Sequence, residues 1–307
     1  MTNVLVTGGA GNLASYVIPR LIEAGYDVTG YDTVTPTKLP DGVKFVLGNL
    51  TSLEDNLRAL TYSMPEVIVH LGAMPWATEQ IRGGGLVTSQ ALPEDSTFQA
   101  NIAGVYYLME AARRLNTLQK VVFTTSYYVL GLGFRISGTP FKVDYLPIDE
   151  FHPNRPEDTY SFSKMLGEEI FHSYSRAYGY KIVNLRLMGV DYPGFRQNHP
   201  YGYVPSDDEK TVEGPIGTTY QYVDARDAAE AILLSIQNDA LGPFEVFNIG
   251  TDTAYAEETQ DLIKRIWPAL APLAEGKISG HEGLISLERA AKVLGYTPKH
   301  SWRTAQG

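Results

Sequence analysis

A tyrosine and a lysine in the stretch TYSFSKMLGEE, residues 159 to 169, are candidates for proton transfer. Tyr160 and Lys164 stand four residues apart, so in a helix their side chains lie one turn apart and can meet. A helix is expected to begin here, because Asp158 or Thr159 can accept hydrogen bonds from its first free N–H groups. A nearby ammonium favours the phenolate, which makes a tyrosine a usable acid or base near neutral pH. A surface tyrosine beside a solvated lysine has the same spacing, so the pair alone does not establish this chemistry.

A glycine-rich turn near the N-terminus has the spacing of a dinucleotide-binding loop. In VLVTGGAGNLA, the residues Gly9, Gly11 and Ala14 follow an expected strand and open an expected helix, whose N-terminus can hold a pyrophosphate. Asp32 ends the next strand about 20 residues further on, where its carboxylate can accept hydrogen bonds from both adenosine ribose hydroxyls. Its charge would repel a 2′-phosphate, and no Arg or Lys occurs in the five residues that follow. The expected cofactor is therefore NAD rather than NADP.

The surrounding sequence alternates short apolar stretches with longer amphipathic ones, a pattern that predicts strands joined by crossover helices. Such an alternation is typical of a parallel sheet covered by helices on both faces. We therefore expect an α/β fold, a Rossmann-type doubly wound parallel sheet with a smaller C-terminal substrate-binding portion. The expected strands span 3–8, 26–32, 43–50, 66–73, 120–126, 181–188 and 245–250, and the expected helices span 13–25, 52–60, 96–116, 159–178, 225–237, 255–267 and 287–294.

The composition of the chain changes after Met188. Residues 1–188 are expected to form the NAD-binding domain that carries the catalytic groups, and residues 189–307 mainly the substrate-binding portion. Segments near 222–250 are the exception, because their strand and helix pattern allows them to return to the first domain. The stretch 189–217 is rich in Gly, Pro and Tyr, and a long aromatic loop of this kind is expected to cover the substrate.

Charge and composition exclude several other classes of protein. The formal net charge is −10 and no basic run occurs, which disfavours binding to nucleic acid. The chain has no Cys and its six His are scattered without ligand spacing, so no metal site is expected. No apolar run approaches the roughly 20 residues of a membrane span, and the N-terminus turns glycine-rich too early for a signal peptide. A cytoplasmic protein is the expectation.

Short segments over nearly the whole chain resemble, in order, the landmarks of the extended short-chain dehydrogenase/reductase family. This family contains nucleotide-sugar epimerases, dehydratases and sugar dehydrogenases. Asn12 stands where an aromatic residue is common, and Asn49 replaces the Asp that usually contacts adenine. The similar segments are TGGAGNLA at 7–14, GNL at 48–50, HLGA at 70–73, Asn101, TTSYYVLG at 124–131, YSFSK at 160–164, YVDARDAA at 222–229, FNIG at 247–250 and AAKVLGYTP at 290–298.

The resemblance implies catalytic roles for Ser126, Tyr160 and Lys164. Tyr160 exchanges the substrate hydroxyl proton while a hydride moves to or from nicotinamide C4. Lys164 lowers the pKa of Tyr160 and hydrogen-bonds the nicotinamide ribose, and Ser126 holds the substrate oxygen near Tyr160. The cofactor-binding residues that the resemblance implies are Gly8, Gly11, Asn12, Leu13, Asp32, Asn49, Leu50, Leu71, Gly72, Ala73, Asn101, Tyr160 and Lys164.

Departures from the family pattern bear on the substrate. Tyr127 and Tyr128 follow Ser126, where the dehydratases of the family carry an Asp-Glu pair, so a 4,6-dehydratase is disfavoured. Gly189 stands at the position of an Asn in nucleotide-sugar epimerases. Thr219, Tyr220 and Gln221 stand where those epimerases carry an Arg for the diphosphate, and without that cation a diphosphate loses charge-assisted hydrogen bonds. The residues expected to contact the substrate are Ser126, Tyr127, Trp76, Gly189 and Arg196.

Three functions remain open from the sequence. The leading hypothesis is an NAD-dependent dehydrogenase that oxidises a hydroxyl of a sugar or sugar acid, because LRLMGV at 185–190 also resembles uronate and aldose dehydrogenases of the family. The alternative is a nucleotide-sugar 4-epimerase of the UDP-hexose type with tightly bound NAD. The third hypothesis is an NAD-sensing scaffold without catalytic activity. It is disfavoured because a scaffold does not need the intact set of Ser126, Tyr160 and Lys164.

A homodimer is expected from the same resemblance. Family members often pair two long helices with their copies across a two-fold axis, and here these would be the helices 96–116 and 159–178. Both carry apolar residues beyond a single stripe, such as Tyr106, Tyr107 and Phe171. A small carbohydrate is the other expected partner.

Overall fold

The computed structural model describes residues 1–78, 93–194, 201–206 and 221–304. Its main sheet consists of seven strands, namely β1 (Asn3–Thr7), β2 (Asp27–Asp32), β3 (Lys44–Leu47), β4 (Val67–His70), β5 (Lys120–Ser126), β6 (Lys181–Leu187) and β9 (Phe244–Ile249). Their order is β3-β2-β1-β4-β5-β6-β9 and every neighbouring pair is parallel. This confirms the expected doubly wound sheet, in which ligands bind beyond the carboxyl ends of the strands where the strand order reverses.

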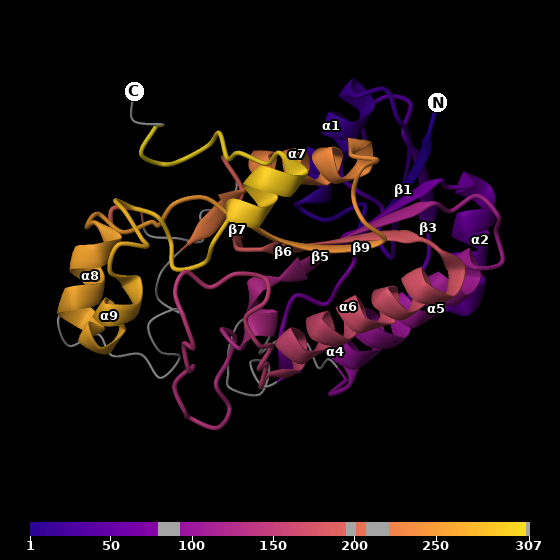
Figure 1. Ribbon diagram of the computed structural model, residues 1–307. Coiled ribbons are helices and arrows are strands. Elements are labelled where there is room, and N and C mark those ends of the chain that lie inside the picture. The colour runs from indigo at the N-terminus through magenta and orange to yellow at the C-terminus, as the bar shows by residue number, and fades with distance from the viewer. Residues whose placement is uncertain (79–92, 195–200, 207–220, 305–307) are drawn as a thin grey trace.

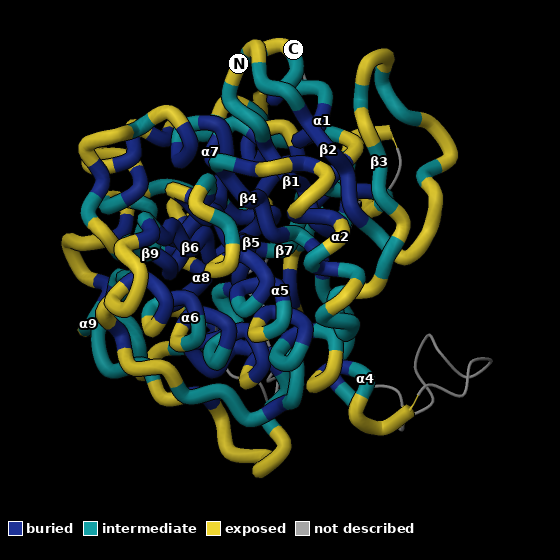
Figure 2. The backbone as a smooth tube through the Cα atoms, turned by 90° about the vertical axis from the view of Figure 1, so that its right-hand side faces the viewer, coloured by how far each residue is buried: buried dark blue, intermediate teal, exposed yellow. Residues whose placement is uncertain are grey.

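Helices cover both faces of the sheet (Figure 1). Successive residues of a strand point to opposite faces, so Val4 and Val6 belong to one hydrophobic core and Leu5 to the other. The central strands are the most buried part of the chain (Figure 2). The first face is covered by α1 (Ala14–Glu23) and α7 (Ala225–Gln237), and the second by α2 (Leu53–Ser63), α5 (Gly104–Ala112) and α6 (Thr159–Tyr178).

A smaller portion lies at one end of the sheet (Figure 1). It contains a pair of parallel strands, β7 (Gly189–Asp191) and β8 (Tyr222–Asp224), and the short helices α8 (Thr259–Ile266) and α9 (Ala271–Ala274).

The segment between β5 and α6 also packs into this smaller portion. The Ile148 amide donates to the Leu284 carbonyl at 2.8 Å, and the Ser286 amide donates to the Ile148 carbonyl at 2.7 Å. In the other direction, α7 and β9 return from beyond residue 188 to the main sheet. The smaller portion and the main sheet therefore each contain residues from both sides of Met188.

The long helix expected at 96–116 is interrupted near its start. α4 (Ser96–Phe98) is followed by a π turn at Gln99–Ala103 and then by α5. A π turn adds one residue to a helical turn and often lies at a functional site. Here it contains Asn101, whose side chain forms hydrogen bonds outside its own helix.

Two further expected helices differ from expectation in their bounds or in their type. The helix expected at 255–267 begins only at Thr259, because Tyr255 is fully buried and its backbone forms a bridge with Tyr203. The helix expected at 287–294 is present from residue 288, and its last five residues, Ala290–Leu294, form a π turn. Within the described part of the chain, no helix is long and apolar enough to cross a membrane.

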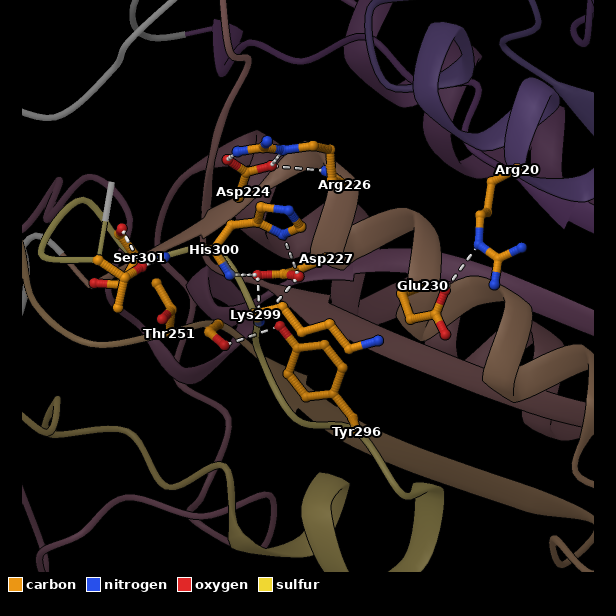
Figure 3. A network of polar contacts seen from close by, with 12 residues as sticks. Arg20, Asp224, Arg226, Asp227, Glu230, Thr251, Tyr296, Lys299, His300 and Ser301 are labelled. Atoms are coloured by element: carbon orange, nitrogen blue, oxygen red, sulfur yellow. Dashed lines mark hydrogen bonds and ion pairs between the residues drawn. The ribbon is translucent and has the colours of Figure 1, made fainter. Parts of the chain in front are cut away.

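A polar network fastens the C-terminal segment to α7 (Figure 3). The buried carboxylate of Asp227 accepts from the amides of Lys299 and His300, at 3.1 Å and 2.9 Å, and from the His300 ring at 2.8 Å. In the next turn of α7, Glu230 pairs with Arg20 of α1 at 2.9 Å. This chain of contacts joins the C-terminal segment to the helix that follows the glycine-rich turn.

Candidate active site

The glycine-rich turn lies in close contact with two neighbouring strands. Gly8 has a φ of +68°, and a Cβ atom placed there would lie 2.7 Å from the amide nitrogen of Gly72. A Cβ on Gly9 would lie 2.9 Å from the Cα of Gly30 in β2. The turn therefore excludes side chains at both positions, which leaves its backbone open above the N-terminus of α1. This is the shape that a pyrophosphate requires.

Asp32 lies at the carboxyl end of β2, beside the glycine-rich turn. Its Oδ2 accepts a hydrogen bond from the Ala10 amide at 3.0 Å, and its Oδ1 accepts from the Thr33 amide at 2.6 Å and the Thr33 hydroxyl at 3.2 Å. A carboxylate has about four acceptor positions, so this one retains capacity for a further hydroxyl donor. Asp32 does not line the main cavity. It is joined through Ala10 to the glycine-rich turn, which does line it.

Ser126, Tyr160 and Lys164 line one cavity of about 760 Å³ together with the glycine-rich turn. Ser126 is the last residue of β5, and Tyr160 and Lys164 lie in the first two turns of α6. The Ser126 side chain lies near the phenol of Tyr160 and lowers its pKa. Residues separated by more than thirty positions in the sequence thus meet at the carboxyl ends of the parallel strands.

Burial governs the acidity of Tyr160. Desolvation raises the pKa of its phenol, the neighbouring Tyr128 raises it further, and the Ser126 hydroxyl acts in the opposite direction. The Lys164 ammonium lies 5.8 Å from the centroid of the Tyr160 ring. Within this chain alone, burial therefore outweighs the expected effect of Lys164, and Tyr160 is a neutral phenol at neutral pH.

Lys164 is a buried cation held by the end of β5. Its Nζ donates to the Thr124 carbonyl at 3.0 Å, and it lies 4.9 Å from the centroid of the Phe123 ring. Burial lowers the pKa of Lys164 to about 8, while the charge of Glu168 raises it. Lys164 is therefore charged at neutral pH, but its pKa of about 8 lies only slightly above that pH.

Asp158 fixes the start of α6 and was expected from the sequence only as a helix cap. Its Oδ1 accepts from the Ser161 amide at 2.8 Å, and its Oδ2 accepts from the Ser161 hydroxyl at 2.5 Å and the Phe134 amide at 2.9 Å. A Cβ on Gly133 would lie 2.1 Å from Oδ2, so the loop before α6 fits closely against this carboxylate. These contacts orient the turn that carries Tyr160.

Asn101 holds the chain after β4 against α6. Its Oδ1 accepts from the Met74 amide at 2.7 Å, and its Nδ2 donates to the Met74 carbonyl and to the Ser163 hydroxyl, both at 3.0 Å. Asn101 is buried and does not line the cavity, although the sequence placed it among the cofactor-binding residues. Its position indicates a structural role next to the site.

The other expected residues fall into three groups. Asn49, Leu50 and Gly72 do not line the cavity. The Asn49 amide donates to Asp55 at 2.9 Å, and Leu50 packs against Gly72 and Gly104. Arg196 lies outside the described residues, as does most of the segment 189–217 that was expected to cover the substrate. The expected residues that line the cavity besides the catalytic three are Gly8, Gly11, Asn12, Leu13, Leu71, Ala73, Trp76, Tyr127 and Gly189.

Several aromatic residues line the cavity that were not expected to contact the substrate. The rings of Tyr127 and Tyr128 lie 4.6 Å apart, and Tyr128 meets Tyr160 edge to face at 6.4 Å. Phe134 and Tyr192 complete this set. The repeated Tyr after Ser126 was the available signal for Tyr128, whereas nothing local in the sequence marks Phe134 or Tyr192.

The cavity holds little positive charge among the residues that the structure describes. Lys164 is the one Lys or Arg in this part of its lining. Gln221, at the position of the diphosphate Arg, is buried and points into the protein. Its amide nitrogen donates to the carbonyls of Thr251 and Ile285, at 3.2 Å and 3.0 Å, and its oxygen accepts from the Ile285 amide at 3.2 Å. Gln221 therefore has a structural role.

Comparison with known proteins gives one extensive family match. The sequence model of the NAD dependent epimerase/dehydratase family matches residues 4–250. A protein described as a putative UDP-glucose 4-epimerase of Methanocaldococcus jannaschii is 29% identical over 275 residues, which is 85% of this chain and 81% of that protein. The UDP-glucose 4-epimerase of Corynebacterium glutamicum is 23% identical, over 97% of this chain and 91% of its own length.

Solved structures share the fold over nearly the whole chain. The UDP-glucose 4-epimerase of Thermotoga maritima, solved with UDP-glucose, gives a TM-score of 0.67 at 24% identity, with 98% of this chain and 94% of that chain covered. A mutated uronate dehydrogenase gives a TM-score of 0.65 at 20% identity, with 99% of this chain and 84% of that chain covered. At these identities the likeness concerns the fold, and it includes proteins with different reactions.

Proposed function

Because this chain belongs to the NAD dependent epimerase/dehydratase family, we propose that it oxidises a hydroxyl of a sugar or sugar acid by hydride transfer, with Tyr160 as acid and base. It is an NAD-dependent enzyme of the extended short-chain dehydrogenase/reductase type. One observation supports the proposed reaction above the others. Ser126, Tyr160 and Lys164 line a single cavity with the glycine-rich turn, so a proton carrier and a cofactor site are adjacent.

The residues that would hold NAD fit its shape and charge. The turn at Gly8 and Gly9 has no room for side chains, which suits a pyrophosphate. Asp32 retains acceptor capacity for ribose hydroxyls and forms no ion pair with a described residue, which suits NAD and opposes the 2′-phosphate of NADP. When bound, NAD supplies the nicotinamide ring that accepts the hydride.

The remaining chemistry belongs to three side chains. The Ser126 hydroxyl, which lies near the phenol of Tyr160, holds the substrate oxygen next to that phenol. Tyr160 takes the hydroxyl proton as the hydride leaves the carbon, so it must act as phenolate in this direction. Lys164, held by the Thr124 carbonyl, places a positive charge near the ring. A second positive charge from oxidised nicotinamide would favour the phenolate further and offset the burial of Tyr160.

A substrate without a nucleotide is the form that we propose. Lys164 is the sole cation in the described lining, and Gln221 is engaged inside the protein. A diphosphate in this cavity would lack the charge-assisted hydrogen bonds that hold such groups elsewhere. Tyr127, Tyr128 and Trp76 instead offer rings against which a sugar ring can pack.

The second candidate function is a UDP-hexose 4-epimerase. Its support is that the C. glutamicum relative is described as a UDP-glucose 4-epimerase and the M. jannaschii relative as a putative one. In that reaction the same Tyr160 would take and return the hydroxyl proton, and the hydride would return to the opposite face of the carbon without net formation of NADH.

One experiment separates these candidates. Purified protein is mixed with NAD and, in parallel, with free uronates, free aldoses and UDP-sugars, and both NADH absorbance and sugar products are followed. Steady NADH formation with a free sugar supports the dehydrogenase. Interconversion of UDP-sugars without NADH supports the epimerase, and NAD binding without either reaction would support a scaffold and refute both.

We also propose a cytoplasmic homodimer formed by α5 and α6. Tyr106 of α5 is 47% exposed and Phe162 and Tyr178 of α6 are 45% and 49% exposed, so an apolar surface is available on adjacent helices. Phe171, expected from the sequence to take part, is fully buried against Phe123 and is excluded from this role. Light scattering at low micromolar concentration would test the dimer, since a 33.9 kDa monomer would contradict it. Enzyme activity in the cytosolic fraction of the source cells would test the location.

A further inference from the structure

A buried ion pair lies next to the proposed catalytic lysine. Glu168 follows Lys164 by one turn of α6, and both residues are 4% exposed. The Glu168 carboxylate accepts two hydrogen bonds from Arg186 of β6, from Nε at 3.0 Å and from Nη2 at 2.8 Å. This bidentate geometry fixes the orientation of the carboxylate, because two parallel N–H···O hydrogen bonds require the guanidinium and the carboxylate to be nearly coplanar.

The polar chain continues beyond Arg186 toward the smaller portion. Arg186 Nη1 donates to the Glu150 carbonyl at 3.3 Å, and the Glu150 Oε1 accepts from the Asn248 amide at 2.7 Å. The other carboxylate oxygen of Glu150 is buried and forms no hydrogen bond with a described residue. Lys164, Glu168, Arg186 and Glu150 thus lie near one another, and Arg186 contacts Glu150 through the backbone carbonyl while its charge acts on the Glu150 carboxylate from a distance.

We propose that Glu168 is a positioning residue for the reaction: its carboxylate, held in place by Arg186, keeps the Lys164 side chain charged inside the protein. The proposal rests on the proposed function, in which Lys164 must be an ammonium to favour the Tyr160 phenolate. Burial disfavours any charge, and a lysine at this depth needs a nearby anion to remain protonated. Glu168 supplies that anion.

The other groups around Lys164 do not replace Glu168. His70 of β4 is buried, and desolvation together with Lys164 lowers its pKa to about 3, so it is neutral. β5 contributes the uncharged Thr124 carbonyl and the Phe123 ring. Tyr160 on α6 is a neutral phenol by itself. Arg186 is positive and would act against Lys164 if its charge were not matched by Glu168.

Removing Glu168 and removing Arg186, each in its own variant, should therefore shift the pKa of Lys164 in opposite directions. Glu168→Gln removes the anion and leaves Arg186 unmatched, so the Lys164 ammonium loses protons at a lower pH. Arg186→Met leaves the Glu168 carboxylate unmatched near Lys164. The Lys164 ammonium then keeps its proton to a higher pH. A purely structural ion pair predicts similar damage from both substitutions, because each leaves one buried charge without its partner.

The direct test is the titration of Lys164 in protein without added cofactor. Protein with ¹³C-labelled lysine is titrated by NMR, and the Lys164 signal is identified by its loss in Lys164→Met. We expect the midpoint to fall by one pH unit or more in Glu168→Gln and to rise in Arg186→Met. Glu168→Asp, which retains the charge, should lie nearer to wild type. The control is Glu110→Gln, which removes a carboxylate paired with Arg113 on the surface and should not move the signal.

A milder variant keeps the test decisive if one of these proteins does not fold. Glu150→Gln removes a more distant carboxylate, whose contact with Arg186 is only electrostatic, and it should lower the Lys164 midpoint by less than Glu168→Gln does. Unchanged midpoints in the variants that fold, or shifts of the same sign for Glu168→Gln and Arg186→Met, would overturn the proposal.

The pH dependence of turnover distinguishes failure of this inference from failure of the proposed function. If both are right, the loss of turnover at high pH moves down in Glu168→Gln and up in Arg186→Met, with NAD affinity following. The Lys164 midpoints could move as expected while the pH dependence of turnover stays unchanged. In that case the effect of Glu168 on Lys164 stands and the role of Lys164 in the reaction is refuted.

Discussion

Gly8 and Gly72 come so close that a side chain on Gly8 would overlap the backbone of Gly72. A Cβ on Gly8 would lie 2.7 Å from the Gly72 nitrogen, and a Cβ on Gly72 would lie 3.1 Å from the Gly8 nitrogen. This contact holds the glycine-rich turn against the chain that follows β4, so the cofactor site and the cavity wall share one backbone support.

Gly8→Ala should therefore destabilise the protein and weaken NAD binding together. The positive φ of Gly8 costs an alanine about 1–2 kcal/mol, and the overlap with Gly72 adds a further cost of about 1–3 kcal/mol. The matched control is Gly25→Ala, because Gly25 has a φ of +87° with no atom within 4 Å of its Cβ position. Thermal melts and NAD titrations of both variants would check this. Equal loss of stability in the two would remove the contact as the cause.

Tyr160→Phe should abolish turnover and leave NAD binding nearly intact. The ring remains in the wall of the cavity and only the proton carrier is lost, so we expect a fall in kcat of about 10² or more. Initial rates and calorimetric NAD titrations would measure the two effects. Retention of more than a few per cent of activity would remove Tyr160 from the proposed role.

Lys164→Met should raise the stability of the protein without cofactor while it abolishes turnover. Burial lowers the pKa of Lys164 to about 8, below its ordinary value of 10.5. Below pH 8 both the folded and the unfolded states hold the proton, so folding bears the full cost of burying the charge. Between pH 8 and 10.5 the unfolded state binds more protons, so the stability of the wild type rises with pH.

The gain in Lys164→Met is therefore largest below pH 8 and disappears as the pH approaches 10.5. The pKa difference corresponds to about 3 kcal/mol, and loss of the hydrogen bond to Thr124 offsets about 1 kcal/mol. Melting temperatures at pH 7 and pH 9.5 would show the trend. Lys277→Met, at an exposed site, is the control, and an equal gain there would contradict the explanation by burial.

Asp32→Ala should relax the preference for NAD over NADP. The substitution removes the acceptor for ribose hydroxyls and the negative charge that repels a 2′-phosphate. Dissociation constants for the two cofactors would give the ratio, with Asp41→Ala as a control at an exposed position. An unchanged ratio would mean that another residue reads the ribose.

Free UDP at millimolar concentration should neither inhibit the enzyme nor raise its melting temperature in the presence of saturating NAD. The described lining of the cavity contains one cation, and Gln221 is engaged within the protein. A ligand present at 100 times its dissociation constant would add roughly 2.7 kcal/mol, which a thermal melt detects easily. A clear rise with UDP would favour the UDP-hexose 4-epimerase.

Local patterns in the sequence were sufficient for the fold and for part of the site. Alternation of apolar strands with amphipathic helices predicts a parallel sheet, because each element must bury one face or both. Two site features also depend on backbone geometry over only a few residues. One is the glycine spacing before the first helix, and the other is the four-residue spacing of Tyr160 and Lys164 within a helix. These features are properties of short segments, so they can be read before the chain is folded.

Tertiary structure decided what distant segments do to one another. It turned Gln221 into the protein and buried Phe171, and it introduced the π turn that carries Asn101 between Met74 and α6. It also raised the pKa of Tyr160 in the chain without cofactor, because desolvation depends on everything packed around a group and not only on the residue one turn away. The Glu168–Arg186 ion pair joins a helix to a strand, and no spacing within either segment predicts it.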